Sequence, residues 1–162
     1  MTRRTVPGAL LALSLLLPLA ACGDDETATG PVPGVSTDLS VAPEVPASDQ
    51  EPPTDLVTDD VVVGEGEEAE SGSTVAVKYV GAFYETGEQF DSSWRRGEDE
   101  TLPVTLGAGQ VIPGFDQGIT GMHEGGRRMV TIPSELGYGE QGTGPIPGGA
   151  TLVFVIDLVD VS

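Results

Sequence analysis

The sequence predicts an α+β domain over residues 54–162, in which a twisted antiparallel sheet of five or six strands wraps around one short helix. Three observations support this fold class. Apolar and polar residues alternate along several short segments, as in strands that bury one face. The chain contains 23 Gly and 13 Pro, which is typical of a turn-rich β protein. Only one segment has apolar residues at convincing helical spacing.

Strand character recurs along the domain. In chain order the predicted strands cover residues 56–63, 75–84, 89–92, 102–106, 127–132 and 151–159. The first strand is interrupted in its middle. The second and third form a hairpin, because residues 85–88 (Glu-Thr-Gly-Glu) are a turn. The last strand is the longest, and it places Leu152, Phe154 and Ile156 on one face.

The single predicted helix follows directly after Ile112. Pro113 occupies its first turn, where a missing backbone N–H costs nothing. Phe115, Ile119 and Met122 then recur at i, i+4 and i+7, so they share one face. Glycines within this segment limit the helix to a short one.

The first 21 residues predict a signal for export rather than a folded segment. Two arginines open it, and the apolar run at residues 9–21 is shorter than the about 20 residues a membrane-spanning helix needs. Residues 19–22 read Leu-Ala-Ala-Cys, which resembles the lipobox of bacterial lipoproteins. This resemblance implies a lipidated Cys22 that anchors the chain at the extracytoplasmic face of the cell membrane. An ordinary secretion signal with an incidental Cys is the alternative, and twin-arginine export fits poorly.

Residues 23–53 predict a disordered tether after Cys22. This stretch holds six Pro and seven acidic residues, with no Lys, Arg or aromatic residue. Such a composition buries too little apolar surface to offset the entropy lost on ordering. The tether is interpreted as a spacer that holds the domain away from a membrane; a linker without a selected role predicts the same disorder.

Charge and composition exclude several classes of function. The net charge of −19 argues against binding to nucleic acid, and a charge of −14 on residues 54–162 favours a monomer. One Cys and one His, His123, provide neither a cysteine cluster nor a multi-histidine metal site. The acidic run at residues 98–100 could hold a cation only weakly, and a solvated loop is the simpler interpretation. We therefore expect no cofactor and no metal.

Aromatic and apolar side chains are the remaining candidates for a site. They comprise Tyr79, Phe83, Phe90, Trp94, Phe115, Tyr138 and Phe154. From the pattern alone they could form either a packed core or a pocket for a small molecule or peptide. Asp91 favours the pocket, because an acid directly after Phe90 in an apolar strand must be exposed, paired or functional.

Five segments resemble the macrolide-binding FKBP-type peptidyl-prolyl isomerases, in the same order along about 100 residues. They are Val77-Lys78-Tyr79-Val80-Gly81, Gly87-Glu88-Gln89-Phe90-Asp91-Ser92-Ser93, Gly109-Gln110-Val111-Ile112-Pro113-Gly114-Phe115, Ile132-Pro133-Ser134-Glu135-Leu136-Gly137-Tyr138-Gly139 and Ala150-Thr151-Leu152-Val153-Phe154. The resemblance covers essentially the whole predicted domain. It implies the FKBP fold and catalysis of cis-trans rotation about Xaa-Pro bonds.

The resemblance also implies the site residues. The catalytic positions are Asp91, Ile112 and Tyr138, and the substrate-binding positions are Tyr79, Phe90, Arg96, Leu102, Val111, Phe115, Ile146 and Phe154. Arg96 would pair with Asp91. Three departures bear on macrolide affinity more than on catalysis: Phe115 stands where many members have Trp, Leu102 where an aromatic is frequent, and the loop at residues 142–147 is one residue short and lacks a His.

The implied mechanism needs no strong acid or base. An apolar pocket disfavours the polar planar amide and holds the proline ring while the bond twists. By resemblance, Phe90, Val111, Phe115 and Phe154 grip the ring. The backbone N–H of Ile112 and the hydroxyl of Tyr138 donate to substrate carbonyls, and Asp91 shapes the polar wall.

The favoured function is a membrane-tethered isomerase that acts on proline-containing segments of exported proteins. The alternative is a non-catalytic peptide-binding or chaperone module on the same fold. Only twelve residues separate Tyr138 from Thr151, too few for the chaperone domain that some family members insert there. A third interpretation is a lipoprotein with a mainly structural role in the envelope.

Overall fold

The computed structural model describes residues 32–162. The predicted signal peptide, the lipidated Cys22 and the first part of the predicted tether lie outside the described residues. Within residues 32–162, no helix combines the length and the apolar character needed to cross a membrane.

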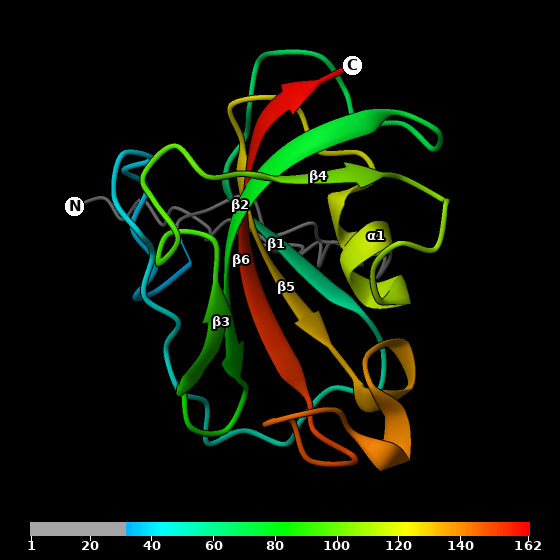
Figure 1. Ribbon diagram of the computed structural model, residues 1–162. Helices are drawn as coiled ribbons and strands as arrows, with labels where there is room; N and C mark the ends of the chain where they lie inside the picture. The colour runs from blue at the N-terminus through cyan, green and yellow to red at the C-terminus, as the bar shows by residue number, and fades with distance from the viewer. Residues whose placement is uncertain (1–31) are drawn as a thin grey trace, which may run out of the picture.

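Six strands form one antiparallel sheet, which confirms the predicted fold class. They are β1 (Val57–Val62), β2 (Thr74–Phe83), β3 (Gln89–Ser92), β4 (Leu102–Thr105), β5 (Arg127–Ile132) and β6 (Leu152–Val161). The spatial order is β1-β5-β6-β2-β3, and β4 pairs with β2. The two longest strands, β2 and β6, lie side by side at the centre (Figure 1). Around them the sheet twists, as antiparallel sheets do.

The element boundaries follow the sequence pattern closely. The helix α1 (Pro113–Ile119) begins at the predicted proline, and β5 has the predicted bounds. The first strand differs: β1 is continuous, with a register shift between Asp60 and Val62 instead of an interruption. The loop before β6 also carries two short 3-10 helices, η1 (Ser134–Leu136) and η2 (Gly139–Gln141), for which the sequence shows no apolar periodicity.

The main core lies between the sheet and α1. Val75, Val77 and Tyr79 of β2 are buried on this face, as their alternation predicts. Two glycines let α1 approach β5 closely. A Cβ atom at Gly114 would lie 2.3 Å from Cγ2 of Ile132, and one at Gly118 would lie 2.7 Å from Cγ1 of Val130. Any larger residue would therefore displace the helix that carries part of the site.

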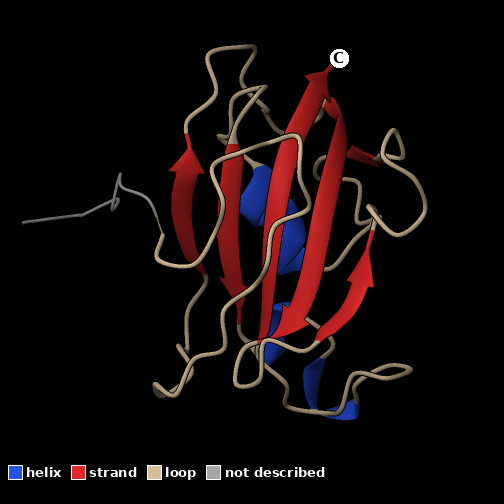
Figure 2. Cartoon of the chain, turned by 90° about the vertical axis from the view of Figure 1, so that its left-hand side faces the viewer, coloured by secondary structure: helices blue, strands red, loops and turns tan. Residues whose placement is uncertain are grey.

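The opposite face of the sheet is covered by residues 32–53, which we call the N-terminal strap. Figure 2 shows a loop running across the strands on the side away from the helices. Val35 of the strap is 6 % exposed and shares a small apolar cluster with Val61 and Val155. The backbone N–H of Ser48 donates to the carbonyl of Tyr84 at 3.0 Å. The strap thus follows the sheet to the end of β2.

The structure of residues 32–53 differs from the disorder predicted for residues 23–53, of which 23–31 lie outside the described residues. The guanidinium of Arg127 donates to three strap carbonyls: those of Ser36 at 2.7 Å, Asp38 at 3.1 Å and Val41 at 3.1 Å. Arg127 is fully buried, so its donors need acceptors. The physical reason for the difference is this distant partner, which the composition of the strap does not reveal.

Candidate active site

A cavity of about 390 Å³ opens between the sheet and α1. It is lined by Tyr79, Phe90, Asp91, Leu102, Gln110, Val111, Ile112, Phe115, Tyr138 and Phe154. These residues come from β2, β3, β4, α1 with its preceding loop, the turn between η1 and η2, and β6. The cavity therefore depends on four of the six strands, and we call it the proline pocket.

Aromatic rings in edge-to-face contact form the apolar wall of the proline pocket. The ring of Phe115 lies 5.1 Å from that of Phe154 at 81°, and 5.7 Å from that of Tyr79 at 83°. The ring of Phe90 meets Phe154 at 5.6 Å and 82°. Such perpendicular contacts are favourable for aromatic pairs. The wall is rigid as a result, since each ring is held by another ring.

One glycine makes this arrangement possible. Gly81 of β2 lies beneath the rings, and a Cβ atom there would stand 2.7 Å from Cε1 of Phe154 and 2.9 Å from Cε2 of Phe90. Its backbone φ is not in the left-handed region, so its role is steric rather than conformational. Absence of a side chain lets both rings settle onto the sheet.

The polar wall is a network of three side chains. The hydroxyl of Tyr79 donates to Oδ2 of Asp91 at 2.6 Å and accepts from Nη2 of Arg96 at 2.9 Å. Arg96 Nη1 lies 3.4 Å from Oδ1 of Asp91. Burial, followed by the hydrogen bond to Asp91, raises the pKa of Tyr79 above its ordinary value. The network fixes the orientation of the Asp91 carboxylate at the pocket edge.

Two donors at the proline pocket have no partner within residues 32–162. The backbone N–H of Ile112 donates to no acceptor, while the carbonyl of Ile112 accepts from Phe115 and Asp116 at the start of α1. The hydroxyl of Tyr138 is likewise without a partner, and its residue is 37 % exposed. Burial, with a smaller effect of Asp91, raises the pKa of Tyr138 above its ordinary value. Both groups are available to carbonyl oxygens of a bound peptide.

The structure brings most of the predicted site residues together. Nine of the eleven line the proline pocket, and Arg96 joins it from outside through Tyr79 and Asp91. Ile146 does not line it. Ile146 is buried in the main core, and its loop closes on itself through paired backbone bonds with Thr143. Gln110, which sequence reasoning missed, lines the pocket while its Oε1 accepts from the N–H of Thr105 at 2.9 Å.

Comparison with known proteins identifies the family. The model of the family described as FKBP-type peptidyl-prolyl cis-trans isomerase matches residues 65–159. An FK506-binding protein of Streptomyces anulatus is 52 % identical over 121 residues, covering 74 % of this chain and 96 % of the relative. A probable FK506-binding protein of Corynebacterium glutamicum is 51 % identical over 107 residues, covering 66 % of this chain and 87 % of the relative.

Solved structures agree with the sequence relatives. The crystal structure of AtFKBP13 has a TM-score of 0.62 and 38 % identity, covering 68 % of this chain and 96 % of that one. The crystal structure of FkpA from Escherichia coli has a TM-score of 0.61 and 39 % identity, covering 74 % of this chain and 52 % of that one. Since the family match spans more than half of the chain, the protein belongs to the FKBP-type peptidyl-prolyl cis-trans isomerases.

Proposed function

We propose that the proline pocket is where the enzyme rotates Xaa-Pro bonds, and that its substrates are proline-containing segments of exported proteins. One observation carries this proposal: the same cavity holds an apolar aromatic wall and two donors without a partner in the described part of the chain, the N–H of Ile112 and the hydroxyl of Tyr138. A proline ring needs the first feature, and the carbonyls on either side of it need the second. The pocket volume of about 390 Å³ suits a proline ring together with the carbonyls on either side of it.

The required acceleration is modest. Rotation about a peptide bond crosses a barrier of about 18–20 kcal/mol, and unaided Xaa-Pro exchange takes tens of seconds or more. Raising the rate to about 100 per second demands an acceleration of roughly 10⁴, or about 5.5 kcal/mol of transition-state stabilisation. Burial of the ring and a few directed hydrogen bonds can supply that amount without covalent chemistry.

Each part of the pocket has one task in this mechanism. Phe90, Phe115 and Phe154 hold the proline ring in a dry environment that disfavours the planar, more polar amide. Ile112 N–H and the Tyr138 hydroxyl bind the flanking carbonyls and keep the peptide from turning with the ring. Asp91, held by Tyr79 and Arg96, sets the polar edge along which the rotating carbonyl moves.

The same pocket is proposed to bind macrolide ligands. Relatives that share about half of their residues with this chain carry FK506 in their names. A macrolide would compete with peptides for the aromatic wall. Leu102 lines the proline pocket, and the loop at residues 142–147 lies beside it. We therefore expect these positions to tune macrolide affinity more than the rate of isomerisation.

We further propose that a lipid on Cys22 anchors the enzyme, as a monomer, to the extracytoplasmic face of the cell membrane. The Leu-Ala-Ala-Cys sequence at residues 19–22 supports this anchoring. The strap contacts the sheet from Val32 onward, and nine residues, 23–31, lie between Cys22 and Val32 in the sequence. Ten peptide steps span at most about 36 Å, so the enzyme would work close to the membrane surface.

A pair of tyrosine substitutions tests the site. Tyr138→Phe removes one proposed donor and leaves the ring in place, whereas Tyr84→Phe makes the same change outside the proline pocket. Cis-trans exchange of a Leu-Pro peptide, followed by magnetisation-exchange NMR, is expected to slow by about tenfold in Tyr138→Phe, which corresponds to about 1.4 kcal/mol. Tyr84→Phe should match the wild type. Equal rates in all three proteins would contradict the assigned role of Tyr138.

Mass spectrometry tests the anchor separately. In a bacterial host, the wild-type chain should be recovered in the membrane fraction with the mass of a chain that begins at lipidated Cys22. Cys22→Ser should lose the lipid and leave the membrane fraction. Recovery of wild-type protein without a lipid adduct would contradict the anchoring proposal and leave the isomerase site untouched.

A further inference from the structure

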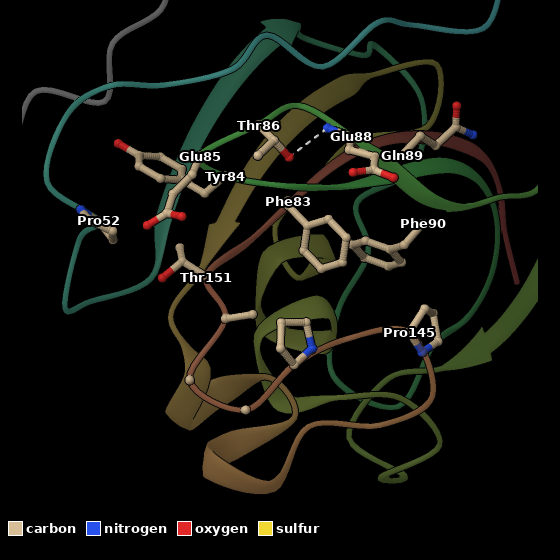
Figure 3. A pocket seen from close by; sticks show the side chains of 14 residues that line it. Pro52, Phe83, Tyr84, Glu85, Thr86, Glu88, Gln89, Phe90, Pro145 and Thr151 are labelled. Carbon is tan, nitrogen blue, oxygen red and sulfur yellow. Dashed lines mark hydrogen bonds between the residues drawn. The ribbon is translucent and has the colours of Figure 1, made fainter.

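A second and larger cavity, of about 720 Å³, lies beside the proline pocket. We call it the hairpin groove, because the turn between β2 and β3 (residues 84–88) forms one of its sides (Figure 3). The loop at residues 145–151 forms the opposite side, and Pro52 of the N-terminal strap contributes from a third direction. The groove therefore depends on segments far apart in the sequence.

A row of aromatic rings joins the hairpin groove to the proline pocket. Phe90 lines both cavities. Its ring lies 5.2 Å from that of Phe83 in the groove and 5.6 Å from that of Phe154 in the pocket. These two steps together span at most about 11 Å, which three or four extended residues cover. A polypeptide whose proline occupies the pocket can thus place a neighbouring side chain in the groove.

The charged side chains that line the hairpin groove are both acidic. They are Glu85 and Glu88, and both are exposed. A third carboxylate, that of Glu140, lies close to Gly149 of the groove, about 3.9 Å from where a Cβ atom would stand. None of these three takes part in an ion pair within residues 32–162.

Of the five Lys and Arg side chains within residues 32–162, four are engaged elsewhere, and the fifth, Arg95, is exposed and lines neither cavity. Arg96, Arg127 and Arg128 pair with Asp91, Asp157 and Asp60. The ammonium of Lys78 lies over the ring of Trp94, 4.3 Å from its centroid. Within residues 32–162, the groove therefore combines apolar side chains with acidic charge that none of its lining residues neutralises.

We propose that the hairpin groove binds a Lys or Arg side chain of the substrate, located within about four residues of the isomerised proline. This proposal rests on the proposed function of the proline pocket. The methylene stem of such a side chain would pack on Phe83 and Pro145, and its charged end would approach Glu85 or Glu88. Lys and Arg side chains commonly place their methylene groups on apolar surface while the charged end stays in a polar environment. The groove would make the enzyme selective for basic proline-containing segments.

The test compares peptides that differ in one charge. Each has the same Leu-Pro core, with Lys, Glu or Gln placed three residues before or three residues after the proline. Exchange rates are measured by NMR with the full-length chain in detergent at low salt. One of the two Lys positions is expected to raise kcat/KM roughly threefold over Gln, as one exposed charge pair allows. The corresponding Glu peptide should fall below Gln.

Two double variants distinguish the effect of the groove's carboxylates from the effect of the chain's overall negative charge. Glu85→Gln with Glu88→Gln removes the acidic side chains of the groove, whereas Glu67→Gln with Glu70→Gln changes the net charge equally at exposed positions that line neither cavity. The Lys preference should vanish in the first variant and persist in the second. The Gln peptide reports the proline pocket alone, and its rate should be the same in all three proteins.

Two outcomes would overturn the proposal. One is equal turnover of Lys and Glu peptides by the wild type while the Gln peptide is isomerised normally. The other is an equal loss of Lys preference in both double variants, which would assign the preference to the charge of the whole chain. Loss of Gln-peptide turnover in the wild type would instead contradict the proposed function of the proline pocket.

Discussion

Arg127 and Asp157 form a bidentate ion pair inside the protein. Nε and Nη2 of the arginine donate to the two carboxylate oxygens at 2.5 Å and 2.7 Å, and both residues are buried. The donors that remain on the same guanidinium hold the carbonyls of the N-terminal strap. One side chain thus joins β5, β6 and the strap. The buried guanidinium of Arg127 needs hydrogen-bond acceptors from the strap as well as from Asp157, and the strap is therefore part of the folded unit.

Arg127→Met is expected to unfold at lower urea concentration and to release the strap. Removing one partner of a buried pair leaves an uncompensated charge, which costs about 3–5 kcal/mol. The double variant Arg127→Met with Asp157→Leu should recover part of that stability without restoring the strap. Urea titration measures the first effect, and limited proteolysis within residues 32–53 measures the second. Unchanged proteolysis of both variants would contradict the role of Arg127 in holding the strap.

Gly81→Ala is expected to disrupt the proline pocket more than the fold. The new methyl group would meet the rings of Phe154 and Phe90 at 2.7 Å and 2.9 Å, and such overpacking costs about 1–3 kcal/mol. Val159→Ile is the control, since it adds one methyl group at an exposed position of β6 that lines neither the proline pocket nor the hairpin groove. We expect kcat/KM to fall at least about tenfold only in Gly81→Ala. Full activity in a folded Gly81→Ala protein would show that the ring positions do not matter.

Asp91 and Tyr79 should be coupled. Asp91→Asn removes the charge that Arg96 faces and weakens the bond accepted from the Tyr79 hydroxyl. Tyr79→Phe leaves the carboxylate without that donor. A double-mutant cycle on kcat/KM should therefore give a coupling of about 1 kcal/mol. Additive effects of the two substitutions would mean that the 2.6 Å bond between these side chains does not contribute to catalysis.

The activity should be insensitive to pH until the tyrosines ionise. The pKa values of Tyr138 and Tyr79 are both raised above 10.0, chiefly by burial. Both hydroxyls therefore lose their protons at higher pH than an unperturbed tyrosine does. Unfolded chains lose these protons first, so the stability that the hydroxyls contribute is fully present below pH 10 and declines as the pH rises through the folded-state values.

Rates measured between pH 7 and pH 11 check this expectation. The wild type should decline only above pH 10 and approach the rate of Tyr138→Phe, which should itself show less dependence on pH. A wild-type decline centred near neutral pH would instead point to a titrating group other than these tyrosines.

Strand alternation and the helical spacing of Phe115, Ile119 and Met122 were enough to predict the sheet, the helix and most of their bounds. These patterns are local, and burial of one face enforces them. The strap could not be predicted, because its order depends on Arg127, which lies about ninety residues away in the chain. The composition of a segment indicates how much apolar surface it can bury by itself, but it does not indicate which distant residue will bind it.

For the site, too, some features could be predicted from the sequence and others could not. Nine of the residues that the resemblance implies line the proline pocket, whereas Ile146 is buried in the main core, in a loop closed by backbone bonds with Thr143. Gln110 carries no apolar signal and so was missed. The hairpin groove is assembled from a turn, a loop and Pro52 of the strap. No single stretch of sequence contains a pattern for a cavity built in this way.

The proline pocket is proposed to rotate Xaa-Pro bonds. The most direct test of this proposal is magnetisation exchange of a Leu-Pro peptide with the full-length chain, in the presence and absence of an equimolar macrolide such as FK506. We predict exchange at least about 10³-fold faster per bound peptide than the unaided rate, and loss of that acceleration when the macrolide is added. A folded protein that leaves the peptide at its unaided rate would contradict the claim.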